Sequence, residues 1–264
     1  MKSSAVRRRE PSVPFSPTTS LPSKRSSEEP QLITSLVKLQ SRQLQNHKQH
    51  SVKTLRRASA ADVNLMFKWS FNDSIEWASR FEPFKNLSSE SQKCVTSEFG
   101  IAFFLIDQGI KTVSENVKDD YWLLQNGTFL DSDSHENSKL SRDQLEFLKT
   151  LETSVKHPFQ LLKIDEFETA ALKTLLLLAP SFSKPNIFYC NEDRVMALRS
   201  KCLQELMEHS ARKHPEQRAE RFGDIILLLG EIRNSVKAVY NHTKVCELFD
   251  RNGFETFVRR YMLS

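Results

Sequence analysis

Apolar residues in this chain recur at helical spacing from residue 31 onward. Val63, Met66, Phe67, Phe71, Ile75 and Ala78 follow an i, i+3, i+4 pattern, which predicts one long amphipathic helix. Residues 101–106 are apolar on nearly all sides, so a second helix, from Ser89 to about Lys111, is predicted to be central. Only 6 of the 264 residues are glycine, which favours helix over a turn-rich β fold.

Two segments depart from the helical pattern. Residues 1–30 hold five of the ten prolines together with many serines, and we predict a disordered hinge or linker there. Residues 121–130 contain two short apolar runs around Asn126-Gly127, which predicts one small β-hairpin with a type I′ turn. Further helices are predicted to begin near Arg142, Asp165, Asn191 and Pro215, with Asp165 and Glu168 at capping-box spacing. The pattern is that of an all-α protein.

Several classes of function find no support. The four cysteines show no C-x-x-C pair, the seven histidines no H-E-x-x-H pattern, and no G-x-S-x-G or Walker loop occurs. We therefore expect no catalytic residues, no metal site and no resident cofactor. The longest apolar runs fall far short of the about 20 residues of a membrane span, so no membrane association is expected.

Two short motifs have competing interpretations. Arg56-Arg57-Ala58-Ser59 is typical of a site for a kinase that prefers basic substrates, although such matches also arise by chance. The stretch 172–176 matches L-x-x-L-L, but it lies in an expected buried helix, where core packing explains it. Apolar residues at 225–229, 232, 236 and 239 exceed what one buried stripe needs, which predicts a two-fold interface along that helix.

Two separated stretches resemble the ligand-binding domain of nuclear hormone receptors. Trp77, Ala78, Phe84, Leu87 and Gln92 stand at the spacing of that family's helix 3 to helix 4 signature. The stretch 221–257 can be aligned without gaps with the last helices of a retinoid-X-type receptor. The chain departs from the family where Glu82 precedes Pro83 and where Ser91 replaces an aspartate. It resembles divergent nematode-type members related to hepatocyte nuclear factor and retinoid X receptors.

The resemblance implies a three-layer α-helical sandwich of about a dozen helices over residues 31–264. It also implies ligand binding, pairing as a homodimer or with another nuclear receptor, and regulation of transcription through coregulators in the nucleus, with the cytoplasm as a second compartment. DNA would be contacted only through a zinc DNA-binding domain that these residues do not include; a short isoform, a truncated gene model and a receptor without that domain all fit. Two alternatives remain, a ligand-independent interaction module of the same fold and a lipid carrier.

The family's pocket positions carry mostly apolar side chains here, for an apolar or fatty-acid-like ligand. The resemblance assigns to this pocket Val63, Met66, Phe67, Ser70, Phe104, Leu105, Lys111, Leu124, Val239, His242 and Cys246. Large side chains among them would equally suit an ordinary filled core. Lys111 stands where retinoid-X-type receptors keep an arginine for a ligand carboxylate, but a solvated lysine at a helix end is the alternative.

The family's coregulator groove and a buried ion pair complete the implied sites. The groove positions are Ser79, Arg80, Lys93, Phe257, Val258 and Arg260. Members of the family hold the coregulator helix between a lysine and an acidic residue, and this chain has Ser79 and Arg260 at those two places. Glu168 and Arg221 match a buried pair that joins two helices, although Glu168 would also suit a capping box alone.

Overall fold

The structure is a computed structural model of the chain. It describes residues 31–115, 118, 120–131, 148–181, 185–188, 191–248 and 256–262, and of residues 242–248 and 262 it describes the backbone alone. Nine α-helices and three short strands occur in those residues, so the all-α class is confirmed and the expected number of about a dozen helices is too high. The predicted linker, residues 1–30, lies outside them.

The elements follow the predicted order along the chain. The helices are α1 (Leu32–Gln49), α2 (Ala60–Ala78), α3 (Glu82–Lys85), α4 (Ser89–Ser114), α6 (His157–Leu162), α7 (Glu166–Leu177), α8 (Glu192–Lys213), α9 (Arg218–Leu248) and α10 (Thr256–Met262). A π-helical segment, η1 (Glu152–Lys156), precedes α6. The strands are β1 (Arg56–Arg57), β2 (Tyr121–Leu123) and β3 (Thr128–Asp131). The start of the helix predicted near Arg142 lies outside the described residues.

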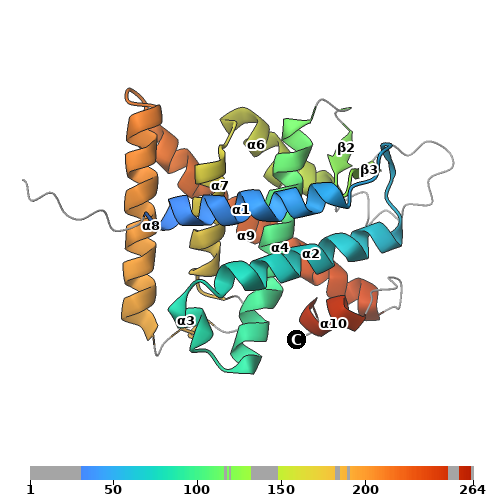
Figure 1. The fold of residues 1–264 in the computed structure, drawn as a ribbon, viewed down its shortest axis with the longest axis horizontal. Helices are drawn as coiled ribbons and strands as arrows, with labels where there is room; N and C mark the ends of the chain where they lie inside the picture. The colour runs from blue at the N-terminus through green and yellow to red at the C-terminus, as the bar shows by residue number, and fades with distance from the viewer. Residues whose placement is uncertain are drawn as a thin grey trace, which may run out of the picture.

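Helix α4 lies at the centre of the fold, as its apolar middle predicts. It packs against α2, α9 and α7. Figure 1 shows α1 and α2 running across the front of α4, α7 and α9. All six side chains of residues 101–106 are buried. A Cβ at Gly100 would overlap the ring of Phe71, so this glycine allows α2 to approach α4 closely.

Helix starts are set by local capping where the sequence predicts it, and elsewhere by contacts that it does not reveal. Asp165 and Glu168 form the predicted capping box of α7. Asn191 lies at the N-cap position of α8 without a side-chain capping bond. The first amides of α1, on Leu32 and Ile33, donate to the Glu205 carboxylate of α8, each at 2.8 Å. That long-range cap links two helices that are far apart in the sequence.

The small sheet differs from the prediction in two respects. Its strand order is β1-β3-β2, with β3 antiparallel to β2 and parallel to β1, so the predicted hairpin gains a third strand. A strand of two residues carries no periodicity, which is why the pattern missed it. The type I′ turn is wrong as well, because Gly127 has a positive φ of 82° and Asn126 does not. Gly127 N–H instead donates to Leu124 O at 2.9 Å.

Among the described helices, none combines the length and apolar character needed to cross a membrane. Cys94 and Cys202 are buried, and neither forms a disulfide bond. Burial raises the pKa of the Cys202 thiol to about 12, and the negative charge of Glu205 adds to this effect. The thiol therefore stays protonated and unreactive. Cys190 lies outside the described residues, as does the side chain of Cys246.

Candidate functional site

The predicted pocket residues of α2 and α4 lie together and pack on one another. The rings of Phe67 and Phe104 stack with centroids 4.5 Å apart. Met66 and Leu105 are fully buried, and Ser70 is 4% exposed. Val63 is half-buried and packs against the same core. Two of the side chains predicted to surround a ligand, Phe67 and Phe104, thus contact each other across the interface of the two helices.

Hydrogen bonds from both its backbone and a side chain hold the hairpin against α4. Leu123 N–H donates to Thr112 Oγ1 at 2.9 Å. Gln125 N–H donates to Gln108 Oε1, and Gln125 Nε2 donates to the carbonyl of Asp107, both at 2.6 Å. These bonds place Leu124, the predicted pocket residue of the hairpin, in the core with no exposed surface.

The other predicted pocket residues lie in the last turn of α4 and in the second half of α9. Lys111 lies in the last turn of α4, where its Nζ is 3.0 Å from Glu115 Oε1 and its side chain is 19% exposed. Val239 of α9 is buried. His242 and Cys246 lie in the same helix, but their side chains are outside the described residues. The structure therefore places Lys111 in an ion pair of the kind common at helix ends.

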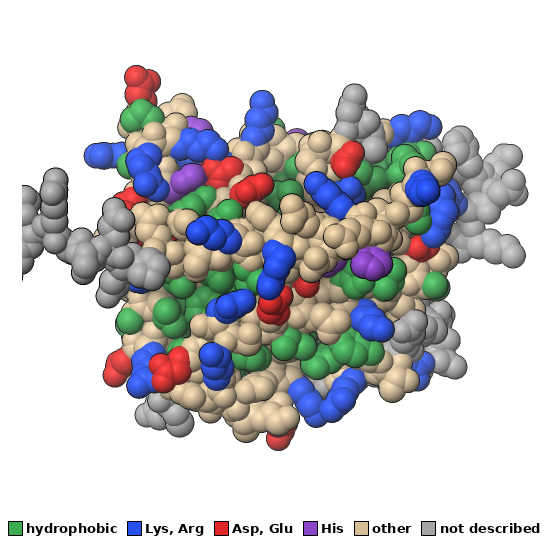
Figure 2. Space-filling model, in the orientation of Figure 1, with side chains coloured by type: hydrophobic (Ala, Val, Ile, Leu, Met, Phe, Trp, Pro, Cys, Tyr) green, Lys and Arg blue, Asp and Glu red, His purple; other side chains and the backbone are tan. Residues whose placement is uncertain are grey.

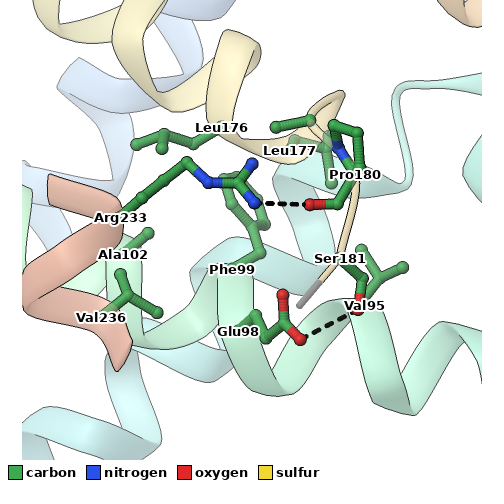
Figure 3. A pocket seen from close by; sticks show the side chains of 11 residues that line it. Val95, Glu98, Phe99, Ala102, Leu176, Leu177, Pro180, Ser181, Arg233 and Val236 are labelled. Atoms are coloured by element: carbon green, nitrogen blue, oxygen red, sulfur yellow. Dashed lines mark hydrogen bonds between the residues drawn. The ribbon is translucent and has the colours of Figure 1, made fainter. Parts of the chain in front are cut away.

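Two hollows in the described part of the chain lie away from these residues. A cavity of about 30 Å³ lies between α4, the end of α7 and α9, and Figure 3 shows the side chains that line it. Arg233 Nη2 donates to the Pro180 carbonyl at its edge, and Ser181 Oγ donates to Glu98. A hollow of about 280 Å³ lies between the end of α7 and the start of α8. Neither contains a predicted pocket residue, and the first has room for only one or two waters.

The terminal helix α10 lies over the crossing of α2 and α4. It packs against both helices and against α9, and Figure 1 shows it beside α2 at the carboxyl end of the described chain. Val258 is fully buried, and the ring of Tyr261 stacks on Phe71 with centroids 5.3 Å apart. Phe257 is half-buried and contacts Tyr261. The terminal helix thus covers the core with the face that carries Phe257, Val258 and Tyr261.

The predicted polar and charged residues of the groove lie just after the end of α2, in α4 and in α10. Ser79 ends α2, and its Oγ donates to the Glu76 carbonyl at 2.7 Å. Arg80 follows it and lies 3.8 Å from the Glu76 carboxylate. Lys93 is half-buried in the first turns of α4, and Arg260 of α10 is exposed. Ser79 and Arg260 occupy the positions where the resemblance implies a lysine and an acidic residue.

Glu168 of α7 and Arg221 of α9 form a two-pronged ion pair in the core. Arg221 Nε and Nη2 donate to the two Glu168 oxygens at 2.7 and 2.5 Å. Glu168 is fully buried, and the Arg221 side chain is 11% exposed. The same carboxylate accepts the Asp165 N–H at 2.9 Å. Glu168 therefore caps α7 and binds α9 at once, which combines the two roles that the sequence left open.

Asp165, Glu168 and His209 each have an oxygen or nitrogen atom of the kind that can bind a metal ion. These three atoms lie within 4.8 Å of one another. Lys213 and His209 also bind Asp165, at 2.6 and 2.8 Å. Burial alone would raise the pKa of the Asp165 carboxyl, but the bonds from Lys213, the Glu168 N–H and His209 outweigh it and lower the pKa to about 2. Lys213 of α8 already balances the charge of Asp165, and Arg221 of α9 balances that of Glu168. The cluster therefore joins α7 to α8 and α9.

Sequence reasoning missed a second buried ion pair, between α4 and α7. Lys173 Nζ lies 2.5 Å from Asp107 Oδ1, and these side chains are 1% and 7% exposed. The ammonium also lies 3.8 Å from the centroid of the Phe103 ring. Burial raises the pKa of the Asp107 carboxyl, although Lys173 opposes that change. Each residue is a single charge in a mostly apolar stretch of helix, and the local sequence pattern does not indicate which residue it pairs with.

It also missed a junction around Asp62, at the start of α2. Asp62 accepts hydrogen bonds from Arg56 of β1, from Ser59, and from Asn126 of the hairpin turn. The hydrogen bond from the Arg56 guanidinium holds the pKa of the Asp62 carboxyl well below its usual range, and the bonds from Ser59 make a smaller contribution in the same direction. The capping-box spacing of Ser59 and Asp62 is the sequence signal that was available for part of it.

A family model described as the ligand-binding domain of nuclear hormone receptor matches residues 48–249 of the chain. The match covers more than half of the chain, from the end of α1 through α9, and includes the Glu168–Arg221 pair. The match ends before α10, so the place of this helix in the fold is given by its packing on α2, α4 and α9 and not by the family match.

Proposed function

We propose, since this chain belongs to the family of nuclear hormone receptor ligand-binding domains, that it is the ligand-binding and dimerisation domain of a receptor that regulates transcription through coregulators. The observation that carries this is the family match across the helical core. The docking of α10 over α2 and α4 supports it, because a helix at this place can form one side of a groove for a partner helix. We further propose the nucleus as its place of action and a divergent, nematode-type position within the family.

One observation favours a second function, that of a ligand-independent interaction module of the same fold. Phe67 and Phe104 stack where a ligand is predicted, and Met66, Leu105 and Leu124 are fully buried around them. Pockets for drug-sized ligands typically measure about 300–1,000 Å³. Native mass spectrometry of the purified chain separates the two functions. A retained small molecule supports the ligand-binding form, whereas a bare chain that also takes up no fatty acid supports the interaction module.

The dimer surface that we propose is the outward face of α9. The apolar stretch predicted as an interface has a buried side and an exposed side in the structure. Ile225, Leu228 and Ile232 lie on the buried side, within the core. Leu227 is 73% exposed. Gly223 and Gly230 lie about one turn before and after it, and each has open space where a Cβ would point. Small residues around an exposed leucine would let the same helix of a second copy approach closely.

Replacing Leu227 with arginine is therefore expected to convert a dimer to a monomer in sedimentation at micromolar concentration. The arginine would place a charge at the centre of an apolar contact. Leu55→Arg is the matched control, because Leu55 is 48% exposed next to β1, which pairs with β3 rather than with α9, and its replacement should leave the dimer intact. A wild-type chain that stays monomeric, with no receptor partner recovered from cells, would count against dimerisation.

The coregulators that we propose differ from ordinary L-x-x-L-L peptides. A helical peptide offers free N–H groups and a positive dipole at its N-terminal end. At the position that would face this end, Arg260 carries a positive charge and accepts no hydrogen bonds. Ser79 offers no charge for the other end. Suitable partners are corepressors, or coregulators with acidic residues near the arginine.

The double variant Ser79→Lys with Arg260→Glu is expected to bind an L-x-x-L-L peptide more tightly, by about 3- to 30-fold in fluorescence anisotropy. Each charge acts on one end of the peptide dipole and contributes about 0.3–1 kcal/mol. Ser200→Lys with Arg199→Glu makes the same substitutions on the exposed surface of α8 and should leave the affinity unchanged. Tight binding by the wild type, or no gain in the double variant, would show that α10 does not work in this way.

Contact with DNA is not part of the proposed function of these residues. Figure 2 shows acidic and basic side chains interspersed over the face that α1 and α2 form. Binding to the phosphate backbone needs cations gathered along one stripe. Arg42, Arg56 and Arg57, which lie in or near this part of the chain, are paired with Glu76, Asp62 and Asp131. We therefore assign DNA contact to a separate DNA-binding domain.

A further inference from the structure

The segment between α1 and α2 exposes a serine that follows two arginines. Residues 53–57 are exposed, as is Ser59, which directly precedes α2. Arg56 and Arg57 form β1 at the edge of the sheet, so the backbone of this segment is already extended on one open side. A kinase with an acidic substrate groove recognises basic side chains two and three positions before a serine. Motif, extended backbone and exposure thus coincide at Ser59.

Ser59 also belongs to the Asp62 junction, which joins three elements. Ser59 Oγ donates to Asp62 Oδ2 at 2.6 Å. The same carboxylate accepts both Arg56 terminal nitrogens, at 2.8 and 2.9 Å, and Asn126 Nδ2 at 2.8 Å. Arg57 binds Asp131 at the end of β3, at 2.7 Å. The two arginines of the motif are therefore the ion-pair partners that hold β1 to α2 and to β3.

We propose that Ser59 is a phosphorylation site for an arginine-directed protein kinase, and that its phosphate loosens the junction between β1, α2 and the hairpin. The donor is a nucleoside triphosphate bound with magnesium by the kinase. Ser59 Oγ forms a bond to the γ-phosphorus, the bond from that phosphorus to the diphosphate breaks, and the hydroxyl proton passes to the base of the kinase. The products are phosphoserine and a nucleoside diphosphate.

The phosphate acts on this junction through charge and through the loss of a donor. It brings about −1.5 to −2 charges to an oxygen that now lies 2.6 Å from the Asp62 carboxylate. The esterified oxygen can no longer donate to Asp62. Arg56 and Arg57 have half-exposed side chains that can turn to the phosphate, and in doing so they leave Asp62 and Asp131. Only short backbone pairing would then hold β1 in place.

The first test treats the folded chain with an arginine-directed serine kinase, magnesium and ATP, and maps the product by peptide mass spectrometry. We expect one phosphoryl group on Ser59, none there in Ser59→Ala, and modification restored in Ser59→Thr, which keeps both the hydroxyl and the N-cap. Ser27→Ala is the matched control, because Lys24 and Arg25 also precede Ser27 and its loss should leave Ser59 modified. Phosphate found elsewhere only, or on Ser59 only after urea unfolding, overturns the proposal.

The second test compares hydrogen exchange of the phosphorylated and unmodified chains. The Val52 amide donates to Asn126 and the Ala58 amide to Phe129, both at 2.8 Å, so each reports the closed junction. We expect both amides to exchange faster after phosphorylation, with α7 unchanged as an internal reference. Unchanged or slower exchange at Val52 and Ala58 would show that the phosphate does not loosen the junction, and would overturn that part of the proposal.

Discussion

Replacing Lys173 with methionine is expected to lower the free energy of unfolding by about 3–5 kcal/mol. Lys173 and Asp107 are both buried, with Nζ and Oδ1 2.5 Å apart. Methionine keeps most of the side-chain volume but removes the ammonium, so the Asp107 carboxylate stays in the core without its partner. Urea unfolding of the wild type and the variant measures the difference.

Adding Asp107→Leu to Lys173→Met is expected to recover most of that stability, because an apolar pair removes the unpaired charge. The pH dependence gives a second check. Burial raises the pKa of Asp107 even beside Lys173, and without the lysine it should rise further. A carboxyl with a raised pKa binds its proton more readily in the folded state, so the loss in Lys173→Met should be smaller at pH about 4 than at pH about 7. A double variant less stable than the single one would contradict this account.

The Glu168→Ala variant is also expected to lose about 3–5 kcal/mol of unfolding free energy. Its carboxylate is fully buried and binds Arg221 through two hydrogen bonds while it caps α7. Removal leaves the Arg221 guanidinium, only 11% exposed, without a carboxylate. The loss of a cap alone would cost about 1 kcal/mol. Urea unfolding therefore distinguishes the two roles by magnitude.

Two variants serve as controls for Glu168→Ala. Glu82→Ala removes the partner of Arg194 in an exposed ion pair, and such pairs contribute about 0–1 kcal/mol. Glu168→Gln keeps an oxygen for the cap and removes the charge, so its stability should lie between those of the wild type and Glu168→Ala. A loss well under 1 kcal/mol in Glu168→Ala would show that the buried pair contributes little.

Local pattern was sufficient for most of the helical elements. Val63 to Ala78 form α2 and the stretch 101–106 is buried in α4, because side-chain spacing decides which face of a helix is apolar. The Asp165–Glu168 capping box formed as predicted, since its partners are three residues apart. The family followed from motif order and spacing, and the family model supports it.

Contacts between distant residues could not be predicted in the same way. Asp107 and Lys173 are 66 positions apart, and their pairing depends on how α4 and α7 pack. The two-residue strand β1 is too short to show a period, and the turn at Gly127 depends on a single backbone angle. The predicted pocket shows the same division, because Phe67 and Phe104 have the expected apolar character while their stacking depends on the approach of two helices.

The sequence by itself determined most of the helices, their apolar faces and the family, because these depend on spacing within one element or on the order of motifs along the chain. The resemblance already implied the Glu168–Arg221 pair, but only the tertiary structure showed that Asp107 and Lys173 meet and which side chains fill the core. The physical reason is that a buried charge is stable only beside its partner, and that close packing is set by the elements on both sides of a contact. Glu168 shows both levels, since its spacing from Asp165 predicts the cap and only the packing of α9 brings Arg221 to it.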